Sequence, residues 1–303
     1  MHPAPIVAVV GATAAGKTSL SLDLAERLGG EVVNTDAMQV YRGMDIGTAK
    51  LPPAERRGIP HHLVDTHEIT EPVSVAAFQS EARTVIAELR GRGVVPVLVG
   101  GSALYVRAVV DRFEFPGTDP ELRARLEADL AEVGPGGIQE RLRAADPEAA
   151  SRIGSENGRR LVRALEVVEL TGRPYSASLP TLEYADPATV QVGVDLDRPS
   201  LDARIEQRVD GMFADGFVAE VERLLVAGLA EGRTASRAIG YPAVAAYLAG
   251  ELTLEEARER TAAATRRFAR RQDSWFRKDP RIRWARFDAE DRVEQALAAV
   301  GGH

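Results

Sequence analysis

The sequence GATAAGKT, residues 11–18, matches the pattern G-x-x-x-x-G-K-[ST] and decides how the beginning of the chain is expected to fold. An apolar, β-branched run, IVAVV (6–10), comes directly before it, and the helical pattern KTSLSLDLAERL follows it. A strand, a glycine-rich loop and a helix in this order are typical of a loop whose backbone N–H groups surround a phosphate. We therefore predict a phosphate-binding loop at the N-terminus of a helix.

Apolar runs continue to alternate with helical patterns along the next hundred residues. The segment EVVNTDAMQVY contains a short strand that ends at Asp36, and VVPVLVGG (94–101) contains another after the helical stretch SVAAFQSEARTVIAELRGRG. Such alternation predicts right-handed βαβ crossovers and a parallel sheet. The carboxyl ends of its strands then form one edge, where open α/β sheets bind their ligands.

The alternation stops at about residue 119, where helices rich in Ala, Arg, Glu and Leu begin. VQVGVDLD (190–197) is a strand pattern that returns to the sheet, and helical patterns dominate from 200 to 278. We predict an α/β fold with a P-loop parallel-sheet core, formed by residues 1–118 and 190–303. An all-helical domain is inserted at 119–189, and the C-terminal region is helical.

The composition limits the class of protein. The 303 residues are 45% hydrophobic, carry a formal charge of −7 and include no cysteine, which excludes disulfides and cysteine-ligated metals. No apolar run approaches the roughly 20 residues of a membrane span, and the N-terminus lacks signal-peptide features, so we expect a cytoplasmic protein. We also expect a monomer. Residues 258–286 nevertheless hold eleven Lys/Arg against three Asp/Glu, a local charge of +8 that suits a nucleic-acid partner.

One expected feature of ATPases and GTPases is missing. Their metal-binding acidic residue ends a later strand, whereas the strand in VVPVLVGGSALY ends in Gly-Gly-Ser. The nearest carboxylate is Asp36 after the preceding strand, where an Asp either caps a turn or acts as a general base. Two interpretations remain open from these residues: a kinase of a small molecule with ATP in the loop, and a transferase whose donor is a diphosphate.

A series of motifs in the same order resembles the tRNA dimethylallyltransferase (tRNA isopentenyltransferase) family in its short bacterial form, over about residues 6–287. The motifs are GATAAGKT, NTDAMQVYRGMDIGTAK, IPHHLVD, VLVGGSALY, RRLVRALEVVELTGRP, SRAIGY and RRQDSWFR. The resemblance implies transfer of the dimethylallyl group of dimethylallyl diphosphate to N6 of the adenine 3′ of the anticodon in tRNAs, with release of diphosphate. A small-molecule kinase and a non-catalytic RNA-binding protein remain as alternatives.

The resemblance also implies roles for individual residues. Asp36 is the base that accepts the proton of the attacking amine, and Ser102, where the family more often has Thr, positions the amine or the leaving oxygen. Lys17, Arg237 and a Mg²⁺ ion held by Thr18 stabilise the departing diphosphate. The diphosphate-binding residues implied in this way are Gly11, Thr13, Ala14, Ala15, Gly16, Lys17, Thr18 and Arg237.

Contacts to tRNA are expected from a basic helical stripe and from the inserted domain. Arginines and a lysine spaced 7, 4 and 7 residues apart fall on one helix face, beside two aromatic side chains that could stack on bases. The stripe consists of Arg260, Arg267, Arg271 and Lys278, with Phe268 and Trp275 next to it. The tRNA-binding residues implied by the resemblance are Asp36, Ala37, Met38, Gln39 (which reads the target base), Ser102, Arg123, Arg159, Arg160, Arg163, Arg267, Arg270, Arg271, Gln272, Trp275 and Arg277.

Two further residues depart from the family pattern, and two adjacent histidines could be mistaken for a metal site. Pro242 replaces a residue that is usually basic in the family, and proline suits the first turn of a helix. Asp273 replaces an apolar residue, which indicates an exposed position or a nearby cation. His61 and His62 are adjacent and point in different directions on a strand or a helix, so we interpret them as scaffolding and not as a shared metal site.

Overall fold

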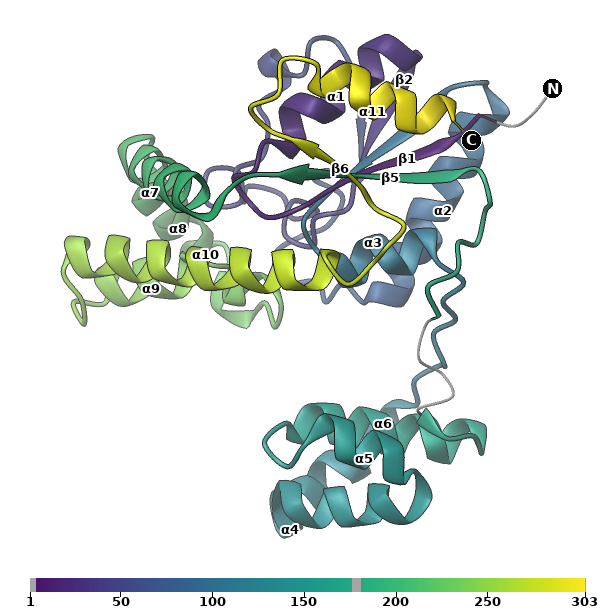
Figure 1. The fold of residues 1–303 in the computed structure, drawn as a ribbon. Helices are drawn as coiled ribbons and strands as arrows, with labels where there is room; N and C mark the ends of the chain where they lie inside the picture. The colour runs from purple at the N-terminus through teal and green to yellow at the C-terminus, as the bar shows by residue number, and fades with distance from the viewer. Residues whose placement is uncertain (1–3, 176–180, 303) are drawn as a thin grey trace. The chain divides into compact units, whose positions relative to one another are not determined.

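The computed structural model describes residues 4–175 and 181–302, and the larger of its two compact units is built around a sheet of six parallel strands (Figure 1). The strands lie in the order β3-β2-β4-β1-β5-β6. Their bounds are Ile6–Val10 for β1, Gly30–Asn34 for β2, His61–His62 for β3, Val95–Val99 for β4, Thr189–Asp195 for β5 and Arg283–Arg286 for β6. All residues of β1 are buried, as expected for a central strand covered on both faces.

Helices cover both faces of this sheet. Figure 1 shows α1 (Lys17–Leu28) and α11 (Arg292–Gly301) on one face, and α2 (Val75–Gly91) and α3 (Ala103–Val110) on the other. The remaining helices of the unit that contains the sheet pack together beyond the ends of the strands. They are α7 (Arg198–Ala214), α8 (Phe217–Val226), α9 (Tyr241–Leu248) and α10 (Leu254–Phe276), with short 3₁₀ turns at Pro53–Glu55, Leu229–Glu231 and Ala235–Arg237.

The strand register gathers three connections at one edge of the sheet. Val9 of β1 is aligned with Val99 of β4 and with Val192 of β5, and Asn34 of β2 is aligned with Val99. The chain therefore leaves β1, β2 and β4 at the same level, through the segments that begin at Gly11, Thr35 and Gly100. This edge is the ligand-binding edge of a parallel sheet.

The strands expected at 6–10, after residue 30, at 94–101 and at 190–197 are all confirmed, as is the α/β class. The sequence analysis did not predict β3 and β6. The pairs that define β3 are Val32 with His61 and Val33 with His62, so two residues become a strand only through their partner. The four residues of β6 pair with Val192–Asp195 of β5.

Residues Asp111–Ala185 form a second compact unit, and Met1–Val110 with Asp186–His303 form the first. The second unit contains α4 (Pro120–Ala145), α5 (Pro147–Ile153) and α6 (Gly158–Thr171), around a core that includes Leu126, Ile138 and Leu161. The insertion expected at 119–189 has different limits here. The entering and leaving segments pair with each other, through a bridge between Asp111 and Tyr184 and a hydrogen bond of 2.8 Å from Arg112 N to Glu183 O.

Within residues 4–175 and 181–302, none of the helices combines the length and the apolar character that crossing a membrane requires.

Candidate active site

The loop Gly11–Thr18 turns sharply between β1 and α1. Gly11 has φ of 137°, and a Cβ atom there would lie 3.0 Å from the carbonyl oxygen of Val194. Gly16 has φ of 103°, and its Cβ would lie 2.4 Å from the ring of Phe287. Both positions therefore require glycine, for the backbone angle and for the close approach. The last two residues of the loop, Lys17 and Thr18, begin α1, where the unpaired N–H groups of the first turn favour an anion.

Lys17 places its ammonium group inside this loop. Its Nζ donates a hydrogen bond of 2.7 Å to the carbonyl oxygen of Ala12. Burial and, to a smaller extent, the positive charge of Arg208 lower the pKa of Lys17 to about 7, although the carboxylate of Asp36 acts in the opposite direction. An anion in the loop would relieve this cost because it favours the charged amine.

Two arginines of α7 reach the same loop. Arg204 Nε donates to the carbonyl oxygen of Ala14 at 2.8 Å, and the guanidinium lies 4.3 Å from the centre of the Phe287 ring. Arg208 Nη1 donates to the hydroxyl of Thr13 at 3.3 Å. Burial, together with the charge of Arg204, lowers the pKa of Arg208. Neither arginine is predicted as a site residue from the sequence, because an i, i+4 arginine pair on a helix is also typical of a solvated surface helix.

Asp36 follows β2 at the sheet edge. The backbone amide of Met38 donates to its Oδ1 at 2.9 Å, and the side-chain oxygen of Asn34 accepts from the amide of Asp36 at 2.8 Å, so a turn fixes the carboxylate. Loss of hydration raises the pKa of Asp36, although the Met38 amide and Lys17 oppose the change. The residue is thus both a turn-capping Asp and a carboxylate of increased basicity.

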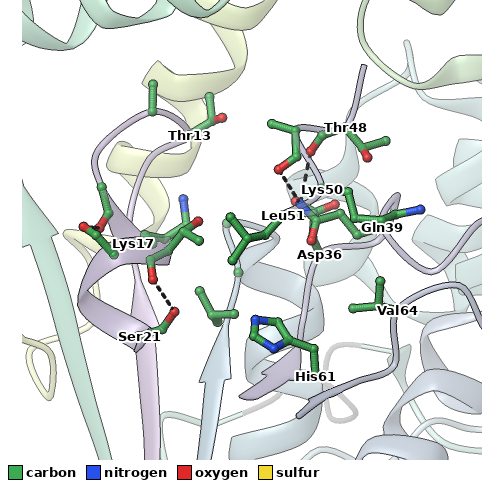
Figure 2. Close-up of a pocket in the computed structure, with 18 of the residues that line it drawn as sticks. Thr13, Lys17, Ser21, Asp36, Gln39, Thr48, Lys50, Leu51, His61 and Val64 are labelled. Carbon is green, nitrogen blue, oxygen red and sulfur yellow. Dashed lines mark hydrogen bonds between the residues drawn. The ribbon is translucent and has the colours of Figure 1, made fainter. Parts of the chain in front are cut away.

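Two cavities share Asp36 as part of their walls. Cavity 1, of about 230 Å³, contains the loop residues Thr13, Lys17 and Thr18. Figure 2 shows Thr13 and Lys17 on one side of it and Asp36, Gln39 and Thr48 on the other. Cavity 2, of about 350 Å³, has a more apolar wall made of Met38, Val209, Met212, Ile239 and Phe268. The residues common to both cavities are Thr13, Asp36, Thr48, Ala49 and Arg208.

Other residues expected to contact the acceptor are divided between the cavities. Gln39 lines cavity 1, and its Nε2 donates to the carbonyl oxygens of Thr48, at 3.1 Å, and Ala49, at 3.4 Å. Ala37, Met38 and Ser102 line cavity 2. Arg237, which the sequence analysis assigned to the diphosphate, also lines cavity 2, whose walls do not include Lys17 or Thr18. Arg204 and Arg208 are the arginines that contact the loop.

The expected tRNA residues of α10 differ in their surroundings. Arg267, Arg270, Arg271 and Trp275 are exposed, and among the described residues Arg267 and Arg270 form no ion pair. Phe268 and Arg271 also line cavity 2, so one face of α10 continues from the surface to the cavity. Gln272 is instead buried, and Arg277 is bound to Asp195 and Asp273 and lies 4.0 Å above the ring of Trp284.

The expectations for Asp273 and Pro242 are confirmed. Asp273 pairs with the guanidinium of Arg277 one turn later, at 3.2 Å, which is the nearby cation that its sequence position indicated. Pro242 lies in the first turn of α9, where its missing N–H has no partner to lose.

In the second unit the expected tRNA residues form two groups. Arg123 and Arg163 both bind the buried carboxylate of Glu166, and although burial acts in the opposite direction, the two guanidiniums hold the pKa of Glu166 below its ordinary value. Arg163 also donates to the carbonyl oxygen of Pro116. Arg159 and Arg160, in contrast, are exposed at the start of α6. Among the described residues, these two arginines form no ion pair.

His61 and His62 have different environments, as expected for neighbours on a strand. His61 lines cavity 1 and its Nδ1 lies 2.9 Å from the carbonyl oxygen of Ile59, whereas Nε2 of His62 lies 2.6 Å from Oε2 of Glu31. Burial lowers the pKa of His61, which favours the neutral imidazole.

The donor groups around the loop suit a magnesium ion that a phosphate ligand brings with it. Thr18 and Asp36 both line cavity 1. In the described part of the chain no group of three or more His, Cys, Asp or Glu side chains could hold a metal alone. Mg²⁺ commonly takes one or two protein oxygens and completes its shell with phosphate and water, which these residues allow.

Comparison with known proteins gives one consistent result. The family model described as IPP transferase matches residues 39–279. The chain is 74% identical over 296 residues to a tRNA dimethylallyltransferase of Nocardioides sp., covering 98% of this chain and 96% of the relative, and 61% identical over 299 residues to one of Salinispora arenicola, covering 97% and 86%.

Solved structures agree. A full-length tRNA isopentenylpyrophosphate transferase from Bacillus halodurans superposes with a TM-score of 0.72 at 40% identity, covering 98% of this chain and 96% of that one. A eukaryotic dimethylallyltransferase acting on tRNA superposes with a TM-score of 0.85 at 26% identity, covering 99% and 79%.

Proposed function

This chain belongs to the IPP transferase family, and we propose that it transfers the dimethylallyl group of dimethylallyl diphosphate to N6 of the adenine 3′ of the anticodon in tRNAs, releasing diphosphate. The observation that carries the proposal is the position of Asp36 in the walls of both cavities. One carboxylate therefore faces a phosphate-binding loop on one side and an apolar space on the other. A reaction between an amine and the carbon end of a diphosphate needs such a junction.

In the proposed reaction the diphosphate occupies cavity 1. The C–O bond of the donor breaks and its electron pair leaves with the diphosphate, so negative charge grows beside Lys17 and Arg208. Thr18 would hold a Mg²⁺ ion, which adds positive charge at the same oxygens. Preorganised cations in a site of low hydration are the largest expected source of rate acceleration.

The nucleophile is the N6 amine of adenine, which is weak because its electron pair is conjugated with the purine. Asp36 accepts a proton from this nitrogen as the N–C bond forms. Its raised pKa makes it a stronger base than a hydrated aspartate. The N–C bond therefore forms as the C–O bond breaks, and the proton of the amine goes to the carboxylate of Asp36.

The adenine must leave the stacked anticodon loop to reach cavity 2, at a cost of a few kcal/mol. The exposed arginines of α10 would bind the RNA backbone, and the exposed ring of Trp275 offers a surface on which a base can stack. Gln39 lines cavity 1 together with Asp36 and is held through its amide nitrogen, so its amide oxygen would meet the adenine amino group where the two cavities join. We propose that the enzyme works as a cytoplasmic monomer.

The test uses the purified protein with Mg²⁺, labelled dimethylallyl diphosphate and an anticodon stem-loop that carries A-A-A across the target site. We expect label in the RNA and an equal amount of released diphosphate, and neither when Asp36→Asn replaces the wild type. ATP-dependent phosphate transfer to a small molecule without RNA would show a kinase instead. RNA binding that Asp36→Asn leaves unchanged, with no product from the wild type, would show a non-catalytic RNA-binding protein.

A further inference from the structure

Glu220 of α8 is a buried carboxylate outside the residues described so far, with 1% of its surface exposed. It accepts hydrogen bonds from three successive backbone amides: Oε2 from Asp45, at 2.9 Å, and Ile46, at 2.7 Å, and Oε1 from Gly47, at 3.1 Å. Oε1 also accepts from the hydroxyl of Tyr241, at 2.7 Å. Among the described residues no Lys, Arg or His pairs with Glu220, so backbone amides and one phenol compensate its charge.

The segment held in this way, residues 45–49, packs closely against α8 and α9. A Cβ atom on Gly47 would lie 2.3 Å from the ring of Phe217 and 2.6 Å from the ring of Tyr241. Ala49 has φ of 52°, a left-handed angle that costs a non-glycine residue roughly 1 kcal/mol or more. Such a backbone persists only when its surroundings fix it, and the carboxylate of Glu220 supplies three of the fixing bonds.

The same segment forms the wall that the two cavities share. Thr48 and Ala49 line both cavities, and Gly47 lines cavity 2. The carbonyl oxygens of Thr48 and Ala49 accept the bonds that orient Gln39. A shift of this segment would therefore move the boundary between the cavities and release Gln39 at the same time.

We propose that Glu220 and Tyr241 are positioning residues that hold residues 45–49 in place and so set the alignment of the acceptor adenine with the donor carbon. The inference rests on the proposed function, because it assigns the two cavities to the two substrates. It joins two segments, DIGTAK and SRAIGY, that lie almost two hundred residues apart in the chain. Neither Glu220 nor Tyr241 lines cavity 1 or cavity 2.

Glu220→Gln tests the proposal with nearly unchanged shape. The new amide group can accept at one oxygen only, and its NH₂ faces backbone N–H groups, so at least one amide loses its partner. A misalignment of the adenine and the donor carbon by up to about 1 Å slows the chemical step more than it weakens binding. We expect kcat to fall about 10- to 100-fold, while the dissociation constant for the anticodon stem-loop stays within about twofold of the wild type.

The matched control is Glu222→Gln, an exposed position on the same helix, which should leave kcat and all binding constants unchanged. Tyr241→Phe keeps the carboxylate and the ring and removes only the fourth hydrogen bond. It should lower kcat in the same direction by about two- to tenfold.

Hydrogen exchange of the peptide that covers residues 45–49 gives a readout that does not depend on activity. Exchange should be faster in Glu220→Gln and Tyr241→Phe than in the wild type, while exchange in the strands of the sheet stays unchanged. Wild-type kcat or wild-type exchange in Glu220→Gln overturns the proposal. If Glu220→Gln does not fold, Tyr241→Phe with wild-type kcat and exchange overturns it instead. An inactive wild type would refute the proposed function, whereas the exchange result would still test the role of Glu220.

Discussion

Gln272 accepts a hydrogen bond of 2.8 Å from the backbone amide of Thr13, which lies 259 residues earlier in the chain. Its Nε2 donates to the carbonyl oxygen of Gly101 at 2.8 Å. The buried amide therefore joins the phosphate-binding loop and the end of β4 to α10, the helix with the exposed basic surface. Gly101 has no room for a side chain here, because its Cβ would lie 2.2 Å from Nε2 of Gln272.

Replacing Gln272 by alanine should weaken donor binding and leave the ionic part of tRNA binding unchanged. Two buried polar groups lose their partners, at about 1–3 kcal/mol each, and the loop loses a fixed point. We expect KM for dimethylallyl diphosphate to rise roughly tenfold or more, and stability to urea to decrease. An unchanged donor KM with a flatter salt dependence of tRNA binding would instead show that Gln272 contacts RNA directly.

Replacing Asp36 by asparagine should lower kcat by about 10²–10⁴-fold and leave tRNA affinity nearly unchanged. The active form of the base is the carboxylate, so kcat of the wild type should decline as pH falls through the raised pKa of Asp36. The variant should lack this acidic limb. Single-turnover rates against pH, with binding measured separately, provide the check; equal losses in rate and in affinity would contradict the role as base.

Because its pKa is lowered in the free site, Lys17 should take up a proton when the donor binds. In the free site its pKa is about 7, and a bound diphosphate raises it. The contribution of the Lys17 charge to donor affinity is thus fully present below pH 7. It is lost as the pH rises through the pKa that Lys17 has in the complex. The dissociation constant should increase by up to about tenfold per pH unit over this window.

Calorimetry in two buffers of different ionisation enthalpy measures the uptake directly. Lys17→Arg keeps its charge throughout and serves as the comparison, because the titration of the donor itself is the same for both proteins. Equal uptake in wild type and variant would mean that the proton does not go to Lys17.

Arg208 is expected to affect diphosphate departure more than Arg237 does. Arg208 contacts Thr13 and lines both cavities, whereas Arg237 lines cavity 2 only. Loss of one preorganised donor to a developing charge costs about 10²–10³ in kcat. Arg208→Ala should show such a loss and weaker inhibition by diphosphate, and Arg237→Ala should change diphosphate inhibition less. The opposite ranking would restore the assignment made from the sequence.

Some parts of the site can be predicted from the sequence and others cannot. The positions of the loop and Asp36 were predictable because each lies in a contiguous pattern next to a strand, and strand ends of a parallel sheet meet at one edge. Arg208 and Glu220 were not predictable, since their partners are backbone groups of distant segments that only tertiary packing brings near. For the same reason β3, two residues without an apolar pattern, was missed while the five-residue strands were found.

The exposed stripe of α10 should account for part of the salt dependence of tRNA binding, and Arg271 and Arg277 make a matched pair for this test. Arg271 is exposed, with its guanidinium 5.8 Å from the ring of Phe268, and Arg277 is neutralised by two aspartates. Arg271→Ala should weaken binding and reduce the slope of log affinity against log salt by about 0.7–0.9, the value for one phosphate contact. Arg277→Ala should leave the slope almost unchanged, because a paired guanidinium releases no counterion from RNA. Affinity measured from low to moderate salt on one stem-loop distinguishes the two. A slope that is unaltered in Arg271→Ala would assign this face of α10 to ordinary solvated surface.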